Sequence, residues 1–190
     1  MSYAKEPILG KDMDRILVSE VEIDAAVRRI ASEIDTDFQN SGKKLLLLGI
    51  LKGSVVFMGD LMKRINTPVE IDFMKVSSYG SGTESSGRIN IVLDLARKDL
   101  KETDIVIIED IIDSGRTLSY LVEYMKFNGA HSVKTATLLD KPSRRVVDLT
   151  PDYVGYEIPD EFVVGYGLDY DEQYRALPYI GVLKPEVYSK

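Results

Sequence analysis

Hydrophobic residues along this chain follow distinct spacings, and each spacing predicts one kind of element. Over residues 23–38 they recur every three or four positions, which is the spacing of one buried helix face. Ser19 and Glu22 form a capping-box pattern before this stretch, and Gly42 follows it. Residues 45–50 are then a continuous apolar run of strand length. The pattern predicts a helix followed by a buried strand.

The next segments predict a second helix and two strands that are solvated on one face. Helical spacing returns over residues 53–65, and apolar residues alternate with polar ones over 69–73 and again over 89–95. Residues 77–87 between these strands consist mainly of serine and glycine, and they are far more numerous than a hairpin turn needs. Ordering such a loop costs entropy, so we expect a flexible lid over a ligand.

The strand and helix pattern then repeats. Buried strands are predicted at residues 104–108 and 133–139, with a helix between them that ends near residue 128. Short aromatic strands are predicted beyond Pro151, at residues 153–158, 162–167 and 179–183. Buried strands that alternate with helices predict an α/β fold with a mainly parallel sheet, whose ligands bind beyond the carboxyl ends of the strands. The loops to examine are therefore 51–54, 109–117 and 140–142.

Composition narrows the class of protein. With 190 residues, of which 44% are hydrophobic, the chain fits one domain over residues 1–190 that folds without disulfides or a structural metal. It has no cysteine, which excludes thiol nucleophiles and fits a reducing compartment. A formal net charge of −7 disfavours nucleic acid and anionic membranes. No apolar run approaches about 18 residues and residues 1–11 lack a signal-peptide core, so we expect a cytoplasmic protein that does not enter a membrane.

The strongest chemical signal lies after the strand at 104–108. Residues 113–117 read Asp-Ser-Gly-Arg-Thr, and their small side chains, two hydroxyls and helix-start N–H groups make a cradle for a phosphate. Glu109 and Asp110 stand directly before it, where carboxylates could hold a divalent cation or sugar hydroxyls. In a plainer interpretation Asp113 only caps the helix and the acids are solvated.

Two lysines occupy the other strand ends. Lys52 is followed by Gly53, which lets a ligand approach the backbone, and Lys141 stands before a proline that favours an extended conformation. Either residue could equally be an ordinary surface or turn lysine. His131, the single histidine, lies between a helix and a strand and is expected to be a surface turn residue, so histidine catalysis is not expected.

Five segments in order resemble the purine phosphoribosyltransferases of the hypoxanthine(-guanine) type. They are LKGS at 51–54, SY at 78–79, IIEDIIDSGRTL at 107–118, LLDKP at 138–142, and EFVVGYGLDY at 161–170 running on to Arg175. The resemblance covers nearly the whole chain. It implies the type I phosphoribosyltransferase fold, in which a central, mainly parallel sheet is flanked by helices and the terminal segments form a small hood.

The resemblance also implies a reaction. A phosphoribosyl group would pass from phosphoribosyl pyrophosphate to hypoxanthine, and to guanine as a further acceptor, with Mg²⁺ as the cofactor and pyrophosphate as the second product. Glu109 and Asp110 would hold the ribose hydroxyls, directly or through magnesium. Residues Asp113, Ser114, Gly115, Arg116 and Thr117 would bind the ribose phosphate, with Arg116 contributing only its backbone. Asp113 would also be the general base.

The remaining roles are implied in the same way. The pyrophosphate would be held by Leu51, Lys52, Gly53 and Arg175, with an unusual cis peptide in the first of these segments. The purine would lie against Phe162, with Lys141 donating to its 6-oxo group and with Val163 and Asp169 completing the base site. Asp169 would hold a second magnesium, and Ser78 and Tyr79 would belong to the lid. Without the resemblance, Phe162 would be interpreted as core, Asp169 as a strand-end carboxylate and Arg175 as a surface charge.

Two other functions compete with this one. A protein of the same fold could sense phosphoribosyl pyrophosphate without catalysis and regulate transcription, but the sequence contains no helix-turn-helix or basic face. Residues 169–171, Asp-Tyr-Asp, superficially resemble the nucleophile motif of aspartyl phosphatases, but Gln173 does not fit that motif. The family implies a homodimer or homotetramer, and the apolar helix at 53–65 is a candidate contact.

Overall fold

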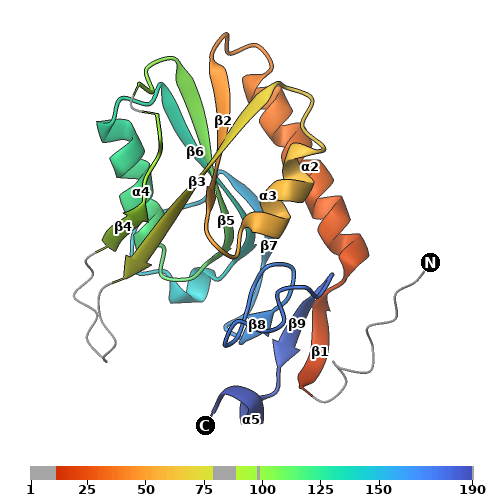
Figure 1. Ribbon diagram of the computed structural model, residues 1–190. Helices are drawn as coiled ribbons and strands as arrows, with labels where there is room; N and C mark the ends of the chain where they lie inside the picture. Colours follow the sequence, from red (N-terminus) through yellow and green to blue (C-terminus); the bar gives the residue numbers. More distant parts are fainter. Residues whose placement is uncertain (1–11, 79–88, 98, 190) are drawn as a thin grey trace.

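Two β-sheets organise the chain (Figure 1), and the computed structural model describes residues 12–78, 89–97 and 99–189. The larger sheet has the strand order β4-β3-β2-β5-β6-β7, in which only the β3–β4 pair is antiparallel. Its strands are β2 (Lys44–Ile50), β3 (Val69–Ser78), β4 (Ile89–Leu93), β5 (Thr103–Ile112), β6 (Ser132–Asp140) and β7 (Tyr153–Glu157). The mainly parallel α/β sheet expected from the sequence is therefore confirmed.

Helices cover both faces of this sheet (Figure 1). The helices are α2 (Glu20–Phe38), α3 (Val55–Met62), α4 (Arg116–Phe127), the short 3₁₀ helix η1 (Pro142–Arg144) and the C-terminal α5 (Pro185–Tyr188). Leu45 and Leu47 of β2 pack in the buried cluster that contains α2 and α3, while Leu46 and Leu48 pack in the cluster that contains α4. Because successive strand residues point to opposite faces, one apolar run fills both layers of the core.

The start of α2 follows the sequence prediction. The hydroxyl of Ser19 accepts a hydrogen bond from the Glu22 backbone N–H at 3.4 Å, and a carboxylate oxygen of Glu22 accepts one from the Ser19 N–H at 2.8 Å. This reciprocal capping box satisfies two N–H groups that the helix leaves free.

A smaller antiparallel sheet forms the hood, with the order β1-β9-β8 (Figure 1). Its strands are β1 (Met13–Val18), β8 (Val163–Val164) and β9 (Ile180–Leu183). Val18, Val163 and Ile180 belong to the same buried cluster as the residues of α2 and α3, so the hood shares a core with the central sheet. None of the helices within the described ranges combines the length and apolar composition needed to cross a bilayer.

Three expectations about the strands need correction. The strand expected at 104–108 continues to Ile112, because Ile111 and Ile112 pair in parallel register with Leu139 and Asp140 of β6. Strand β1 was not expected at all, since its residues show no regular alternation.

The third correction concerns the aromatic segments. The first of them, β7, joins the central sheet. The strand expected at 162–167 is reduced to two residues, because Gly165 and Gly167 with φ of +103° turn the chain. Of the lid expected at 77–87, the first two residues end β3, and Tyr79 and the rest lie outside the described residues.

Candidate active site

The last residues of β5 place two carboxylates on opposite faces of the sheet. Glu109 lines a cavity of about 140 Å³ together with residues of the following loop. Asp110 faces the loop after β2, where a Cβ added at Gly53 would lie 1.7 Å from its Oδ2. Burial raises the pKa of Glu109 well above its ordinary value, and the neighbouring charge of Asp110 adds to this effect. Burial also raises the pKa of Asp110, to about 6.

The loop between β5 and α4 surrounds the smaller cavity. This cavity is lined by Glu109, Ile111, Ile112, Asp113, Ser114, Gly115, Thr117 and Leu118. Gly115 is the N-cap of α4 with φ of +78°, and no side chain caps the helix, so the interpretation of Asp113 as a helix cap is wrong. The first N–H groups of α4 have no partner within the helix: that of Arg116 donates to the Ser114 hydroxyl at 3.4 Å, and those that follow it point toward the end where an anion can bind. Arg116 is exposed and does not line the cavity.

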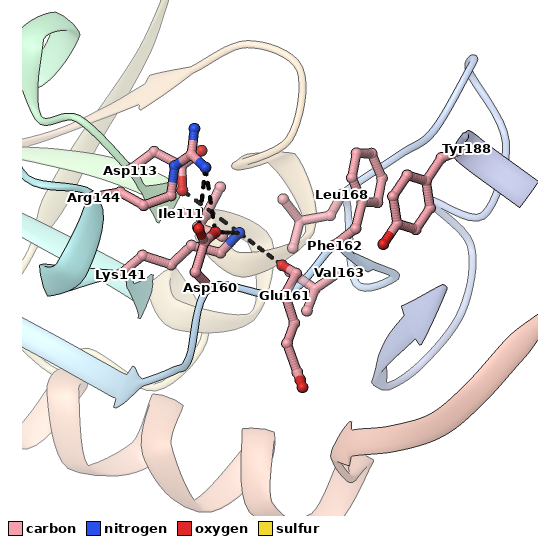
Figure 2. Close-up of a pocket in the computed structure, with 10 residues that line it drawn as sticks. All are labelled: Ile111, Asp113, Lys141, Arg144, Asp160, Glu161, Phe162, Val163, Leu168 and Tyr188. Carbon is pink, nitrogen blue, oxygen red and sulfur yellow. Dashed lines mark hydrogen bonds and ion pairs between the residues drawn. The ribbon is translucent and has the colours of Figure 1, made fainter. Parts of the chain in front are cut away.

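A second cavity, of about 370 Å³, adjoins the first at Ile111 and Asp113. It is lined by Ile111, Asp113, Lys141, Arg144, Asp160, Glu161, Phe162, Val163, Leu168 and Tyr188 (Figure 2). Figure 2 shows charged side chains from the loops at the edge of the central sheet on one side of the cavity, and the rings of Phe162 and Tyr188 on the other. The Phe162 and Tyr188 rings stack with centroids 4.6 Å apart, and Phe162 meets Tyr170 edge-on at 5.5 Å. A flat apolar ligand could be held at this ring pair.

Lys141 is the buried cation of this cavity, which Arg144 also lines. Lys141 is only 7% exposed, and its Nζ donates a hydrogen bond to the Glu161 carbonyl oxygen at 2.7 Å. The same Nζ lies 3.6 Å from Asp113 Oδ1 and 3.9 Å from Asp160 Oδ1. Arg144 in turn lies 3.2 Å from Asp160 (Figure 2). Lys141 is therefore not an exposed turn lysine, because its ammonium is buried and is paired within the cavity.

The loop after β2 packs against the carboxylate Asp110. The peptide bond between Leu51 and Lys52 is cis, as the resemblance implied. Gly53 is buried between Asp110 and Gly167, since a Cβ added at Gly167 would lie 2.1 Å from the Gly53 carbonyl oxygen. Side chains at these two glycines would force the loops apart.

Charged groups converge beside this loop. Arg175 Nη1 donates to the Gly167 carbonyl oxygen at 2.7 Å, and its Nη2 lies 2.8 Å from Asp169 Oδ1. Lys52 Nζ lies 2.7 Å from Glu172 Oε1. The charge of Arg175 lowers the pKa of Asp110 and that of Asp169 raises it, although burial dominates. Arg175 is thus partly buried and paired with Asp169 and the Gly167 carbonyl, and is not a free surface charge.

Comparison with known proteins decides the family. The family model described as the phosphoribosyl transferase domain matches residues 18–171 of this sequence. The chain belongs to the phosphoribosyltransferase family. The hypoxanthine-guanine phosphoribosyltransferase of Bacillus subtilis is 54% identical over 182 residues, which cover 96% of this chain and 99% of that protein.

Longer relatives and a solved structure agree with this membership. The bifunctional protein TilS/HprT of Listeria monocytogenes is also 54% identical over 182 residues, but the chain spans only 28% of its length. A crystal structure of a hypoxanthine phosphoribosyltransferase from Staphylococcus aureus matches with a TM-score of 0.92 and 48% identity, covering 98% of this chain and 100% of that one. The fold is therefore that of a type I phosphoribosyltransferase.

The phosphoribosyltransferase fold brings most of the expected residues to one edge of the sheet. Asp113 and Thr117 line the smaller cavity, and Lys141, Phe162 and Val163 line the larger one. Asp169 lies with Arg175 and is not among the residues that line the larger cavity. His131 lies in the turn before β6, as expected, at the opposite end of that strand.

Sequence reasoning missed several residues of the site. Tyr188, Asp160, Arg144 and Glu172 have no motif of their own, and each reaches the site from a loop or a terminal segment. Two of them had a signal in the sequence: Asp160 stands directly before the recognised segment that begins at Glu161, and Glu172 lies in the stretch that runs on from that segment to Arg175.

The donors suit a hard divalent cation. Glu109, Asp110 and Asp169 offer carboxylate oxygens, the ligand type that magnesium prefers, and no cation among the described residues forms an ion pair with Asp110. Over residues 12–78, 89–97 and 99–189, however, no three acidic or histidine side chains converge on one point. A cation here would need further oxygens from a substrate, as magnesium commonly does with phosphates.

Proposed function

We propose that this protein is a purine salvage transferase that moves the phosphoribosyl group of phosphoribosyl pyrophosphate to hypoxanthine, giving inosine monophosphate and pyrophosphate. Guanine, giving guanosine monophosphate, is the second acceptor. The observation that carries this proposal is the pair of adjoining cavities with Asp113 between them, one a phosphate cradle and one a flat pocket with a buried lysine. The relatives named as hypoxanthine-guanine phosphoribosyltransferases support it and disfavour the non-catalytic sensor.

The larger cavity would hold the purine. The base would lie against Phe162, with its edge at the main chain of Val163, and Lys141 Nζ would donate to the 6-oxo oxygen. Because Nζ already makes one bond at 2.7 Å, the ammonium is oriented before the base arrives. Adenine would present an amino group to this donor and leave the N–H that faces the base without an acceptor, which can lower the rate by several orders of magnitude.

The smaller cavity would hold the ribose phosphate. Backbone N–H groups of residues 114–117 and the hydroxyls of Ser114 and Thr117 would bind its oxygens, and Arg116 would contribute only its N–H. Glu109 and Asp110 would bind the ribose hydroxyls, directly or through magnesium. Asp113 would then stand between the ribose and the purine, where a carboxylate can take the proton from the purine ring nitrogen as general base.

The charged loops would hold the leaving group. Leu51, Lys52 and Gly53 would bind the pyrophosphate with backbone and side-chain donors, and Arg175 would add a forked donor. A Mg²⁺ bound together with the ribose hydroxyls would be held by Glu109 or Asp110, which point to opposite faces of the sheet, and Asp169 would hold a second. When bound, magnesium would neutralise the charge that develops on the departing pyrophosphate. The lid residues Ser78 and Tyr79 would exclude water, and this remains a prediction because Tyr79 lies outside the described residues.

We also propose that the protein acts in the cytoplasm as a homodimer or homotetramer. The absence of cysteine fits a reducing compartment. Three apolar side chains of α3 are exposed in the isolated chain, namely Val55, Val56 and Met62, and Val21 at the start of α2 is 80% exposed. A second copy that covers these side chains would remove apolar surface from water. Sedimentation analysis of the protein with a charged residue at Val56 tests this contact.

Nucleotide formation tests the proposed reaction. Phosphoribosyl pyrophosphate and magnesium are incubated with hypoxanthine, guanine, xanthine and adenine in parallel, with a control that lacks magnesium. We expect turnover with the 6-oxo purines, none with adenine, and loss of all turnover without magnesium. Absence of turnover with every base, while phosphoribosyl pyrophosphate still binds, would replace the transferase with the sensor of the same fold.

A further inference from the structure

A carboxylate already bridges the two cations that we assign to pyrophosphate. Glu172 Oε1 lies 2.7 Å from Lys52 Nζ, and Glu172 Oε2 lies 3.3 Å from Arg175 Nη2. Each oxygen of one carboxylate therefore occupies a donor that the pyrophosphate would need. Such an arrangement places two anionic oxygens where two oxygens of a phosphate group are expected.

The backbone holds this carboxylate in place. Residues 170–173 form a tight turn in which the Tyr170 and Gln173 backbones exchange hydrogen bonds of 3.0 and 3.3 Å. Its two central residues, Asp171 and Glu172, have φ of +50° and +59°, a conformation that Asn and Gly adopt at much lower cost. The Glu172 N–H also donates to Asp169 Oδ2 at 2.9 Å. Left-handed backbone at two consecutive non-glycine residues is unusual, and such strain concentrates at functional sites.

The contacts of Glu172 can break during a reaction cycle. Its side chain is 65% exposed and that of Lys52 is 53% exposed, so their ion pair is weak and readily exchanged. The hydrogen bonds from Lys52 and Arg175 hold the pKa of Glu172 below its ordinary value, so the side chain is an anion at neutral pH. An anion that can leave and return is a competitor for the site and not a permanent part of its wall.

We propose that Glu172 competes with pyrophosphate for Lys52 and Arg175, neutralising both cations in the empty site and weakening the hold on pyrophosphate after the transfer. This inference rests on the proposed function, because it takes Lys52 and Arg175 as the pyrophosphate ligands. Without the competitor, both cations would be free to bind the leaving group and would release it more slowly. Glu172 thus adjusts how long pyrophosphate stays bound.

Titration with inorganic pyrophosphate tests the competition. Binding to the full chain is measured by calorimetry at one fixed magnesium concentration for the natural protein, Glu172→Gln and Asp171→Asn. Because exposed ion pairs are individually weak, we expect Glu172→Gln to bind pyrophosphate about three- to tenfold more tightly. This gain in pyrophosphate affinity should shrink at about 0.5 M salt, where exposed charges are screened. Glu172→Asp, which keeps the charge on a shorter side chain, should fall between the natural protein and Glu172→Gln.

The control variant Asp171→Asn separates the loss of the Glu172 carboxylate from a change in net charge or in the strain of the turn. Asp171→Asn removes one negative charge from the same turn, and Asp171 is exposed, so its pyrophosphate affinity should stay within about twofold of the natural protein. Equal or weaker binding by Glu172→Gln would overturn the inference, since the carboxylate would then help to position the cations. Nucleotide formation by the natural protein is measured separately, and its absence would count against the proposed function while leaving the binding comparison intact.

Discussion

Asp113 occupies a position that no other acidic side chain of the described site shares. It lines both cavities, and its Oδ1 lies 3.6 Å from Lys141 Nζ. Asp113→Asn keeps the shape but cannot accept the proton of the purine ring. We expect kcat to fall by about 10²–10⁴ with nearly unchanged binding of phosphoribosyl pyrophosphate, as measured by steady-state kinetics and by calorimetry.

A matched variant identifies the source of that loss. Asp160 also lines the larger cavity and lies 3.9 Å from Lys141 Nζ. Asp160→Asn should lower kcat by less than about tenfold, because it removes charge near Lys141 and leaves Asp113, the proposed base, in place. If Asp113→Asn retained the natural kcat, Asp113 would have no part in the proton transfer.

Asp110 makes the stability of the ligand-free protein depend on pH. Burial raises its pKa to about 6, above its ordinary value near 3.9, so the folded state binds this proton more tightly than the unfolded state does. The contribution of Asp110 to the free energy of unfolding is therefore most favourable below about pH 4. It falls by up to about 3 kcal/mol as pH rises from about 4 to 6. Asp110→Asn removes the burial cost and also the repulsion on Glu109.

Urea unfolding in the presence of a chelator measures this effect. Relative to the natural protein, Asp110→Asn should gain stability progressively between pH 4 and 7, while losing nucleotide formation. A difference that stays constant over this range would show that the Asp110 carboxyl titrates normally in the folded protein.

At the scale of elements, the loop after β2 and the end of β5 are in direct contact. A Cβ added at Gly53 would lie 1.7 Å from Asp110 Oδ2, so Gly53→Ala must displace either the loop or the carboxylate. We expect a destabilisation of about 1–3 kcal/mol and a raised KM for phosphoribosyl pyrophosphate. Gly59→Ala in α3 is the control, because its Cβ would meet nothing within 4 Å and alanine favours a helix. Equal behaviour of the two variants would contradict the close packing.

At the start of β5, far from the candidate site, lies a buried carboxylate whose effect on stability has the opposite pH dependence to that of Asp110. Asp104 is 2% exposed, and it bonds to the Ser132 hydroxyl and lies 2.7 Å from His131 Nδ1. Although burial opposes them, these bonds lower the pKa of Asp104, so its stabilisation is present above about pH 4 and is lost as pH falls.

Asp104→Asn tests this contact away from the site. The variant should lose about 1–3 kcal/mol of stability at pH 7, because Ser132 and His131 lose their hydrogen bonds to a buried, charged carboxylate. The kcat of the folded fraction should stay unchanged, which thermal unfolding and kinetics together would show. A loss of kcat with normal stability would instead connect Asp104 to the reaction.

The sequence predicted the bounds of some elements better than those of others, and the reasons are physical. Apolar periodicity located α2 and β2 well, since each buries a long regular face. It ended β5 too early, because Glu109 and Asp110 interrupt the apolar run although the ladder to β6 continues past them. The carboxylates expected in a loop are therefore held on a strand, which fixes them on opposite faces.

At the scale of the whole molecule, the hydrophobic pattern within single segments could not predict the hood sheet. Met13 pairs with Leu183 across almost the entire chain, and no periodicity within either segment reports that pairing. The motifs nevertheless predicted which strand ends meet, because parallel strands share their carboxyl edge. Tyr188 and Glu172 escaped prediction, since their roles depend on how the hood and its turns fold back onto that edge.

One measurement tests the central claim that the two adjoining cavities form a single nucleotide site. A crystal structure of the protein with inosine monophosphate would show where each half of the product binds. We predict that the phosphate lies in the loop at residues 113–117 and the base between Phe162 and Lys141, with Asp113 within hydrogen-bond distance of the purine ring. A phosphate outside that loop, or a base away from Lys141, would contradict the account.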